Sequence, residues 1–263
     1  MYNFNYSKAG SADAASQALA SAEDGKVMAG GMTLIPTLKQ RLAAPSDVID
    51  LAGANLSGIR KDGNAIVIGA MTTHATVAGS ADVKSAIPAL ADLADGIGDP
   101  AVRNRGTIGG SIANNDPAAD YPSALVALGA TVKTTKREIA ADDFFTGMFE
   151  TALDEDEIIT EVSFPVPEKA GYAKFPNPAS RYAIVGSFVA KTAGGVRVAI
   201  TGAAPCVFRV QAWEDALSSN FSADAISDGA VDAGSMNADI HAGADYRAHL
   251  CGVMTKRAVA KAG

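Results

Sequence analysis

The sequence predicts an α+β fold, and three observations in its 263 residues predict it. First, the chain opens with an apolar stretch, a helical pattern and a second apolar stretch, which is typical of a β-α-β unit. Second, two apolar runs at 183–190 and 196–200 are separated by Gly194-Gly195, which is typical of an antiparallel hairpin. Third, helical spacing follows this hairpin, so we expect an antiparallel sheet with helices on one face.

The first 51 residues predict alternating strands and helices. They are a strand at 2–6, a helix capped by Ser11 or Asp13 and followed by Gly25, a strand at 26–29, a helix over 34–42 ended by Pro45, and a strand at 48–51. The apolar residues of the second helix share one face, and Pro36 fits its first turn because a missing amide costs little there. A helix N-terminus therefore lies next to Gly30-Gly31.

The middle of the chain predicts a hairpin, two helices and two further strands. A turn at 61–64 joins two strands, of which the second is at 65–70. One amphipathic helix is predicted at 81–97, and another helix at 123–128, between Pro122 and Gly129. Two further strands are predicted at 130–134 and 158–164, with an aromatic loop at 144–149 between them. Asp120 is placed to cap the helix that begins at Pro122.

A domain boundary is predicted at about 165–171, where Pro165, Pro167 and Gly171 cluster. The predicted domains are 1–167, with subdomains at about 1–53 and 54–167, and 168–263. The second domain would hold the hairpin described above. Its helical segments are predicted at 211–217, 224–232 and 246–260.

Composition excludes several classes of function. The net charge of −7 and the pI near 5.0 argue against a nucleic-acid surface, which calls for a basic face. No stretch approaches about 18 consecutive apolar residues, so no membrane span is expected. The first residues lack the basic and apolar regions of a signal peptide, and we expect a cytoplasmic protein.

Cysteine and histidine are too sparse for a metal centre. Cys206 and Cys251 are far apart and belong to no Cys-x-x-Cys pattern, so the chain cannot supply the four thiolates of an iron–sulfur cluster. His74, His241 and His249 have no metal-ligand spacing with carboxylates. We therefore expect no metal site. A functional His74 near a cofactor pocket is the alternative, but we expect this residue to lie at a helix cap or on the surface.

Two glycine-rich loops are the strongest candidates for a binding site. Gly30-Gly31 follows a predicted strand, and Gly109-Gly110 is followed by Ser111. Adjacent glycines let the backbone approach a ligand, and free amides and hydroxyls around them suit a phosphate. Each loop alone is typical of a turn, but two such loops together indicate the pyrophosphate of a dinucleotide.

Two other groups of charged residues stand out in the sequence. Arg103 and Arg105 precede the second loop, where they could neutralise phosphate or pair with Asp99. The acidic run at 154–157 is typical of a solvated turn, and we assign it no chemistry.

Five motifs in order resemble the FAD-binding medium subunit of molybdenum hydroxylases, of the aerobic carbon monoxide dehydrogenase and xanthine dehydrogenase type. The resemblance extends over essentially the whole chain. The motifs are Ala29-Gly30-Gly31-Met32-Thr33-Leu34-Ile35-Pro36 with Lys39-Gln40-Arg41-Leu42, Asp99 to Ser111, Phe144 to Ile159, Lys174-Phe175, and Ser180-Arg181-Tyr182-Ala183. Met32 and Ser111 depart from several members, which have Gln, His or Asn there.

The resemblance implies a fold of the vanillyl-alcohol oxidase and p-cresol methylhydroxylase type with a small C-terminal domain. It implies FAD in the two loops, non-covalently, since no histidine or cysteine is placed for covalent attachment. The implied FAD-binding residues are Ala29, Gly30, Gly31, Met32, Thr33, Leu34, Thr107, Ile108, Gly109, Gly110, Ser111, Asn114, Asp120, Ile159, Lys174 and Tyr182. Among them Asp120 would contact the ribityl or ring region, Ile159 would pack near the flavin, and Lys174 and Tyr182 would reach its ring system.

The implied function is electron transfer without an acid–base pair, so we assign no catalytic residue. FAD here would relay electrons from iron–sulfur clusters to an external acceptor. A large molybdopterin subunit and a small [2Fe-2S] subunit would be the partners, in a dimer of heterotrimers. The alternatives are a stand-alone FAD-dependent reductase or oxidase, and a scaffold or anion-binding domain without cofactor.

Overall fold

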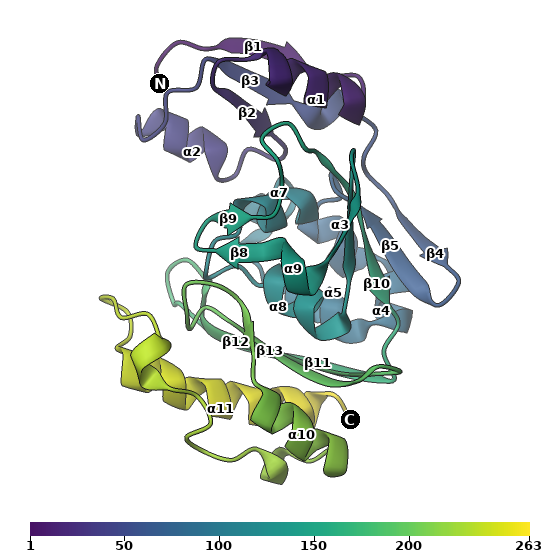
Figure 1. The fold of residues 1–263 in the computed structure, drawn as a ribbon, viewed down its shortest axis with the longest axis vertical. Helices are drawn as coiled ribbons and strands as arrows, with labels where there is room; N and C mark the ends of the chain where they lie inside the picture. Colours follow the sequence, from purple (N-terminus) through teal and green to yellow (C-terminus); the bar gives the residue numbers. More distant parts are fainter.

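In the computed structural model, which describes residues 1–263, three sheets are stacked along the long axis of the molecule (Figure 1). The strand orders are β1-β3-β2 in the N-terminal sheet, β4-β5-β10-β6-β7 in the middle sheet and β11-β12-β13-β14 in the C-terminal sheet. A two-stranded hairpin, β8-β9, lies beside the middle layer. Strands and helices are mixed in every layer, which agrees with the predicted fold class.

The N-terminal layer is a parallel sheet with a helix between its first two strands in the chain. Its elements are β1 (Asn5–Lys8), α1 (Ala12–Ser21), β2 (Gly25–Met28), α2 (Leu34–Lys39), β3 (Asp47–Asp50) and the short 3-10 helix η1 (Leu51–Gly53). The β-α-β prediction is confirmed, and the Ser11 hydroxyl accepts the Ala14 amide as the cap of α1.

Two boundaries in this layer differ from the prediction. The first strand begins at Asn5 instead of residue 2. Helix α2 ends at Lys39, six residues before Pro45, because Arg41 takes a left-handed conformation with φ of +60°. The apolar face that predicted a longer helix therefore extends past its end to Leu42, which is exposed.

The middle layer is antiparallel and carries most of the helices. Its strands are β4 (Ile59–Asp62), β5 (Ala65–Gly69), β6 (Thr131–Thr134), β7 (Glu138–Ala140) and β10 (Ile159–Pro165). Its helices are α3 (His74–Gly79), α4 (Ala81–Ala86), α5 (Pro88–Asp95), α6 (Pro100–Arg103), α7 (Ile108–Asn114), α8 (Tyr121–Leu128) and α9 (Ala141–Phe144). The hairpin around 61–64 and the helix after Asp120 are confirmed.

Two predictions in this layer are wrong. The single helix at 81–97 is two helices, because Pro88 has no amide hydrogen and instead begins α5. The aromatic loop at 144–149 is structured: Phe144 ends α9, and β8 (Phe145–Gly147) and β9 (Glu150–Thr151) form a hairpin.

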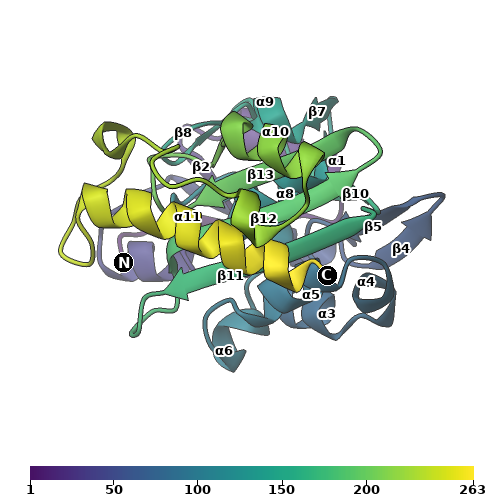
Figure 2. The same ribbon diagram turned by 90° about the horizontal axis from the view of Figure 1, so that it is seen from below.

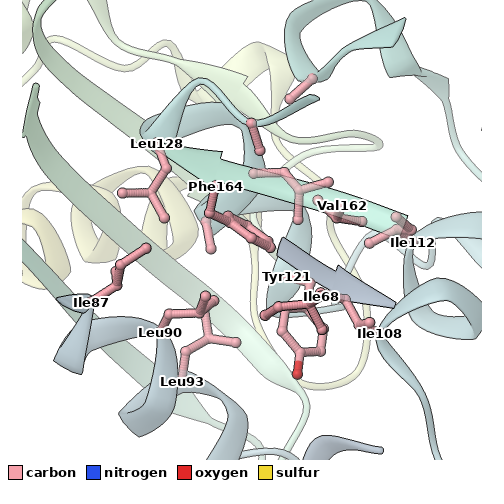
Figure 3. Close-up of a cluster of buried hydrophobic side chains, with 14 of the residues drawn as sticks. Ile68, Ile87, Leu90, Leu93, Ile108, Ile112, Tyr121, Leu128, Val162 and Phe164 are labelled. Carbon is pink, nitrogen blue, oxygen red and sulfur yellow. The ribbon is translucent and has the colours of Figure 1, made fainter. Parts of the chain in front are cut away.

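The largest core fills the space between the middle sheet and its helices (Figure 3). Val162 of β10 stands opposite Ile68 of β5, and Phe164 stands opposite Ile66. These side chains belong to one buried cluster with residues of α5, α7 and α8, namely Leu90, Leu93, Ile108, Ile112, Tyr121 and Leu128. Helix α7, which carries Gly109-Gly110, is thereby fixed to the sheet.

The C-terminal layer is an antiparallel sheet with two main helices. Its elements are β11 (Lys169–Pro176), β12 (Ala183–Thr192), β13 (Gly195–Thr201), β14 (Phe208–Arg209), α10 (Gln211–Ser219), η2 (Ala223–Ala225), η3 (Ala233–Ser235) and α11 (Ala244–Lys261). The predicted hairpin at Gly194-Gly195 is confirmed. The predicted helix at 224–232 is wrong, because that segment contains only the end of the short turn η2.

Helices cover both faces of this sheet, whereas one covered face was predicted. Helices α10 and α11 lie across one face (Figure 2), and α5 and α8 of the middle layer contact the other. Along β12, Phe188 belongs to the core of the middle layer and Val189 to the core under α10 and α11. Burial on both faces explains why residues 183–190 are apolar without alternation.

No helix of the structure combines the length and the apolar character that crossing a bilayer requires.

Candidate functional site

A cavity of about 730 Å³ opens between the N-terminal and middle layers. This volume lies in the range of small-molecule and cofactor sites, which is about 300–1,000 Å³. Its wall combines the loop between β2 and α2, the start of α7, the segment before β10 and the turn between β11 and β12. Of the predicted site residues, all except Ile108 and Lys174 line it.

The two glycine loops are in direct contact in this wall. A Cβ atom on Gly30 would lie 1.8 Å from the carbonyl oxygen of Arg105, and one on Gly109 would lie 2.7 Å from that of Ala70. Neither position can accept a side chain without moving backbone. Gly31 has φ of +75°, which also favours glycine. The pairing of the loops therefore depends on glycine.

Only the first loop offers a run of free amides. The N–H groups of residues 30–34 make no hydrogen bond within the protein. In the second loop, the amides of Ile108 and Gly109 donate to Thr72 and Ala70, and that of Gly110 donates to the Thr107 hydroxyl. We expected both loops to present free amides. This expectation is wrong for the second loop, because two of its amides hold α7 to the segment after β5 and the third is bonded to the helix cap Thr107.

Three polar side chains on the two segments that carry the glycine loops lack hydrogen-bond partners in the protein. Thr33, Ser111 and Asn114 line the cavity, and the hydroxyl or amide group of each makes no hydrogen bond. Thr107 instead caps α7 with its hydroxyl, 3.1 Å from the Gly110 nitrogen. A run of free amides with neighbouring unpaired hydroxyl and amide groups fits the diphosphate and polyol of a dinucleotide.

Asp120 forms a buried polar cluster with two residues of β11. Its carboxylate accepts hydrogen bonds from the Tyr172 hydroxyl and from Lys174 Nζ, the latter at 2.9 Å. Burial raises the pKa of Asp120, and the Lys174 ammonium opposes this shift. Asp120 precedes α8 but does not cap it with its side chain, so that prediction is wrong.

Lys174 lies behind Asp120 and does not line the cavity. Its Nζ also donates to the carbonyl oxygens of Gly96 and Arg181, both at 2.9 Å. These bonds join the middle layer to the turn that carries Tyr182, which lines the cavity and is about half exposed. Ile159 lines the cavity, and Ile108 is fully buried in the core beneath it.

Asp99 and Arg103, which precede the second loop, have structural partners. Asp99 caps α6 by accepting the Val102 amide, so the predicted pairing with an arginine is wrong. Arg103 donates to the carbonyl oxygens of Ile97 and Gly98 and lies 3.7 Å from Asp95. Neither Arg103 nor Arg105 contributes its side chain to the cavity wall.

The acidic run is only partly a solvated turn. The side chain of Glu157 is fully buried, and it accepts hydrogen bonds from Thr134, Arg137 and the Asp154 amide. Burial works against ionisation, but these hydrogen bonds outweigh it and lower the pKa of Glu157 to about 2. Glu157 also lines the cavity, with Asp154 and Glu155. The expectation of a solvated turn is therefore wrong for Glu157.

Sequence reasoning missed several residues of the cavity wall. His74 is buried, with 5% of its surface exposed, so the expected surface position is wrong; it is the first residue of α3, and Thr73 is the cap. Ile97, Gly98 and Val102 line the cavity beside it. No cluster of His, Cys, Asp and Glu suited to a metal ion is present.

Comparisons with known proteins identify the family of the chain. Residues 2–167 match the family described as the FAD binding domain in molybdopterin dehydrogenase. The chain is 36% identical to the nicotine 6-hydroxylase medium subunit of Paenarthrobacter nicotinovorans, covering 98% of this chain and 96% of that protein. It is 34% identical to the carbon monoxide dehydrogenase medium chain of Hydrogenophaga pseudoflava, covering 90% and 88%.

Solved structures extend the likeness to the whole fold. Reconstituted CO dehydrogenase from Oligotropha carboxidovorans gives a TM-score of 0.92 at 32% identity and covers 99% of this chain and 97% of that chain. Quinoline 2-oxidoreductase from Pseudomonas putida gives a TM-score of 0.89 at 29% identity. The matched length, the fold and the paired glycine loops lead to one conclusion: this chain belongs to the FAD-binding medium subunits of the molybdopterin dehydrogenases, a family of oxidoreductases.

Proposed function

We propose that this chain binds FAD non-covalently in the cavity between its N-terminal and middle layers and serves as the electron-exit subunit of a molybdenum hydroxylase complex. The observation that carries the proposal is the run of free amides at residues 30–34, held against the second glycine loop by the contact of Gly30 with Arg105. Such a run is suited to an anion, and a diphosphate is the anion that a dinucleotide supplies.

Each part of the wall has a role in this proposal. The amides of the first loop and the side chains of Thr33, Ser111 and Asn114 hold the diphosphate and its neighbouring hydroxyls. Asp120, supported by Lys174 and Tyr172, contacts the ribityl or ring region, and Tyr182 packs at the ring. When bound, FAD can take up an electron pair and pass electrons on singly or in pairs. The protein supplies position, charge and exclusion of water.

A partner must deliver the electrons, because the chain cannot build the centre that would. Cys206 and Cys251 are the only cysteines, and Cys251 is buried with its pKa raised to about 12 by burial. The relatives are named as medium subunits and chains of multi-subunit enzymes. We assign the molybdenum cofactor and the [2Fe-2S] clusters to partner subunits, with electrons leaving through FAD to an external acceptor.

Three finer points stay predictions within this proposal. They are the domain division at 167 and 168, the arrangement as a dimer of heterotrimers, and the cytoplasmic location. The first is supported by the change of sheet between β10 and β11.

The test is a titration of the purified whole chain with FAD, followed by acid precipitation to release the dinucleotide. We expect tight binding and complete release of FAD. The same chain, recovered from its native host, should carry molybdenum and iron in stoichiometric partners. A chain that binds no FAD would overturn the proposal, and an isolated chain that oxidises organic substrates unaided would favour the stand-alone reductase or oxidase.

A further inference from the structure

The imidazole of His74 lies in the cavity wall without any hydrogen bond to the protein. Its Nδ1 atom is fully buried and unpaired. Nε2 also lacks a hydrogen-bond partner, but unlike Nδ1 it is not fully buried. The ring therefore reaches the cavity through its Nε2 edge. Buried polar atoms without partners are rare and call for an explanation.

The surrounding backbone fixes the ring in this position. The His74 amide donates to the carbonyl oxygen of Gly106 at 3.0 Å, and Thr73 pairs with Thr107 in a β-bridge. A Cβ on Gly106 would lie 2.6 Å from His74 Nε2. Glycine at 106 therefore leaves room for the ring edge immediately before the second glycine loop.

The ring is neutral near pH 7. Burial and, to a smaller extent, the nearby Arg103 of α6 lower the pKa of His74 to about 4. The other titratable group that faces it is Tyr121 of α8, whose ring centroid lies 5.4 Å away and whose pKa is raised by burial. A neutral imidazole has one N–H donor and one acceptor nitrogen.

His74 adjoins the end of the cavity that the turn of β11 and β12 closes. The amide of the neighbouring Gly106 donates a hydrogen bond to the Val102 carbonyl oxygen at 2.7 Å. The Val102 side chain lies against Gly98, and the Gly98 carbonyl oxygen accepts a hydrogen bond from Arg181. Tyr182 follows Arg181 and also lines the cavity. This is the end to which the proposed function assigns the flavin.

We propose that His74 is a further FAD-binding residue, whose Nε2 atom makes a hydrogen bond to the flavin half of the cofactor. The inference rests on the proposed function. A purely structural residue at this place would better be apolar, because an aromatic ring without nitrogens would fill the same space and leave no buried Nδ1 unpaired.

The experiment compares three variants of the whole chain. His74→Phe keeps a flat ring and removes both nitrogens. His74→Gln can place a carboxamide atom near the position of Nε2, whereas the shorter side chain in His74→Asn reaches only the position of Nδ1. We expect the FAD dissociation constant to rise about tenfold in His74→Phe and His74→Asn and to stay within about threefold of wild type in His74→Gln.

Two further measurements separate binding from folding. The affinity for ADP, which lacks the flavin half, should be the same in all four proteins. The melting temperature of the FAD-free chain should not fall in His74→Phe, because that substitution removes an unpaired buried nitrogen.

The outcomes are distinguishable. If wild type binds no FAD, both this inference and the proposed function fail. If wild type binds FAD and His74→Phe binds it equally well, only the role of His74 is overturned. Should His74→Phe not fold, the Gln and Asn variants decide, since equal affinities in these two would overturn the hydrogen bond at Nε2.

Discussion

Single residues in this chain are most constrained where one backbone approaches another. Gly30 meets the Arg105 carbonyl, and Gly109 meets that of Ala70. These glycines were recognised in the sequence because Gly-Gly after a strand is a local signal. Their actual contacts lie far along the chain, so the reason why each must be glycine was not predictable.

The substitution Gly30→Ala should abolish tight FAD binding. Its Cβ would lie 1.8 Å from the Arg105 oxygen, so the loops must separate, and the free amides lose their arrangement. We expect the dissociation constant measured by FAD titration to rise at least about tenfold, or about 1.4 kcal/mol. Gly10→Ala is the matched control, because nothing lies within 4 Å of that Cβ. Unchanged affinity in Gly30→Ala would contradict the contact.

Glu157 should make the protein sensitive to acid. Its pKa is about 2 in the folded chain, below the ordinary value of 4.5, so its contribution to stability is complete above pH 4.5 and is lost as pH falls toward 2. The contribution is on the order of 3 kcal/mol. Urea unfolding of Glu157→Gln should show lower stability at pH 7 and a flatter loss between pH 5 and pH 2.

Glu155→Gln is the control for this prediction, since the neighbouring Glu155 is exposed and makes no ion pair. The assignment fails if the two variants have equal free energies of unfolding at pH 7.

Among the elements, α7 connects the cavity wall with the β8-β9 hairpin. Its N-terminal end carries the second glycine loop, and its C-terminal cap is Asn115, which takes a left-handed conformation with φ of +41°. The Asn115 side chain donates to the carbonyl oxygens of Gly147 and Glu150, and its own carbonyl accepts the Phe149 amide. The β8-β9 hairpin is thus fastened to the helix that borders the cavity.

Two substitutions at Asn115 should separate backbone strain from side-chain bonding. Asn115→Gly keeps the left-handed conformation and loses two hydrogen bonds, which should cost about 1–3 kcal/mol in urea unfolding. Asn115→Ala should cost about 1 kcal/mol more, because alanine resists that conformation. Amide hydrogen exchange at Phe149 should accelerate in both variants. Equal stability of the Gly and Ala variants would argue against the strain.

For the whole molecule, the decisive feature is that the C-terminal sheet lies between two cores. Tyr172 and Phe188 complete the core of the middle layer, while Val189 and Trp213 belong to the core beneath α10 and α11. Each face of the sheet would be exposed without its neighbour. The layers therefore depend on one another for burial of apolar surface.

We predict one cooperative unfolding transition for the whole chain. Trp213, the only tryptophan, reports on the core beneath α10 and α11, and far-UV circular dichroism reports on all layers. In Phe188→Ala, the free energy of unfolding should fall by about 3–5 kcal/mol when measured with either probe, although Phe188 belongs to the core of the middle layer. Two separate transitions would show that the layers fold independently.

Local signals in the sequence determined the fold class, the hairpin at Gly194-Gly195 and the two glycine loops, and they narrowed the cap of the first helix to Ser11 or Asp13, because each depends on a few neighbouring residues. The glycine loops together with the family resemblance predicted a set of site residues of which all but two line the cavity. The local signals failed at Pro88, where the missing amide hydrogen divides one predicted helix into two, and in the segment 224–232, which contains only the end of a 3-10 turn.

Only the tertiary structure decided the rest. The partners of Asp120 lie about fifty residues away on β11, those of Glu157 include β6 and the turn after it, and His74 is covered by α6 and α8. Burial and charge at such residues arise from segments distant in the chain that the core brings together. The physical reason is that the solvation and hydrogen bonds of a side chain depend on the groups around it, and the packing of the layers determines which groups those are.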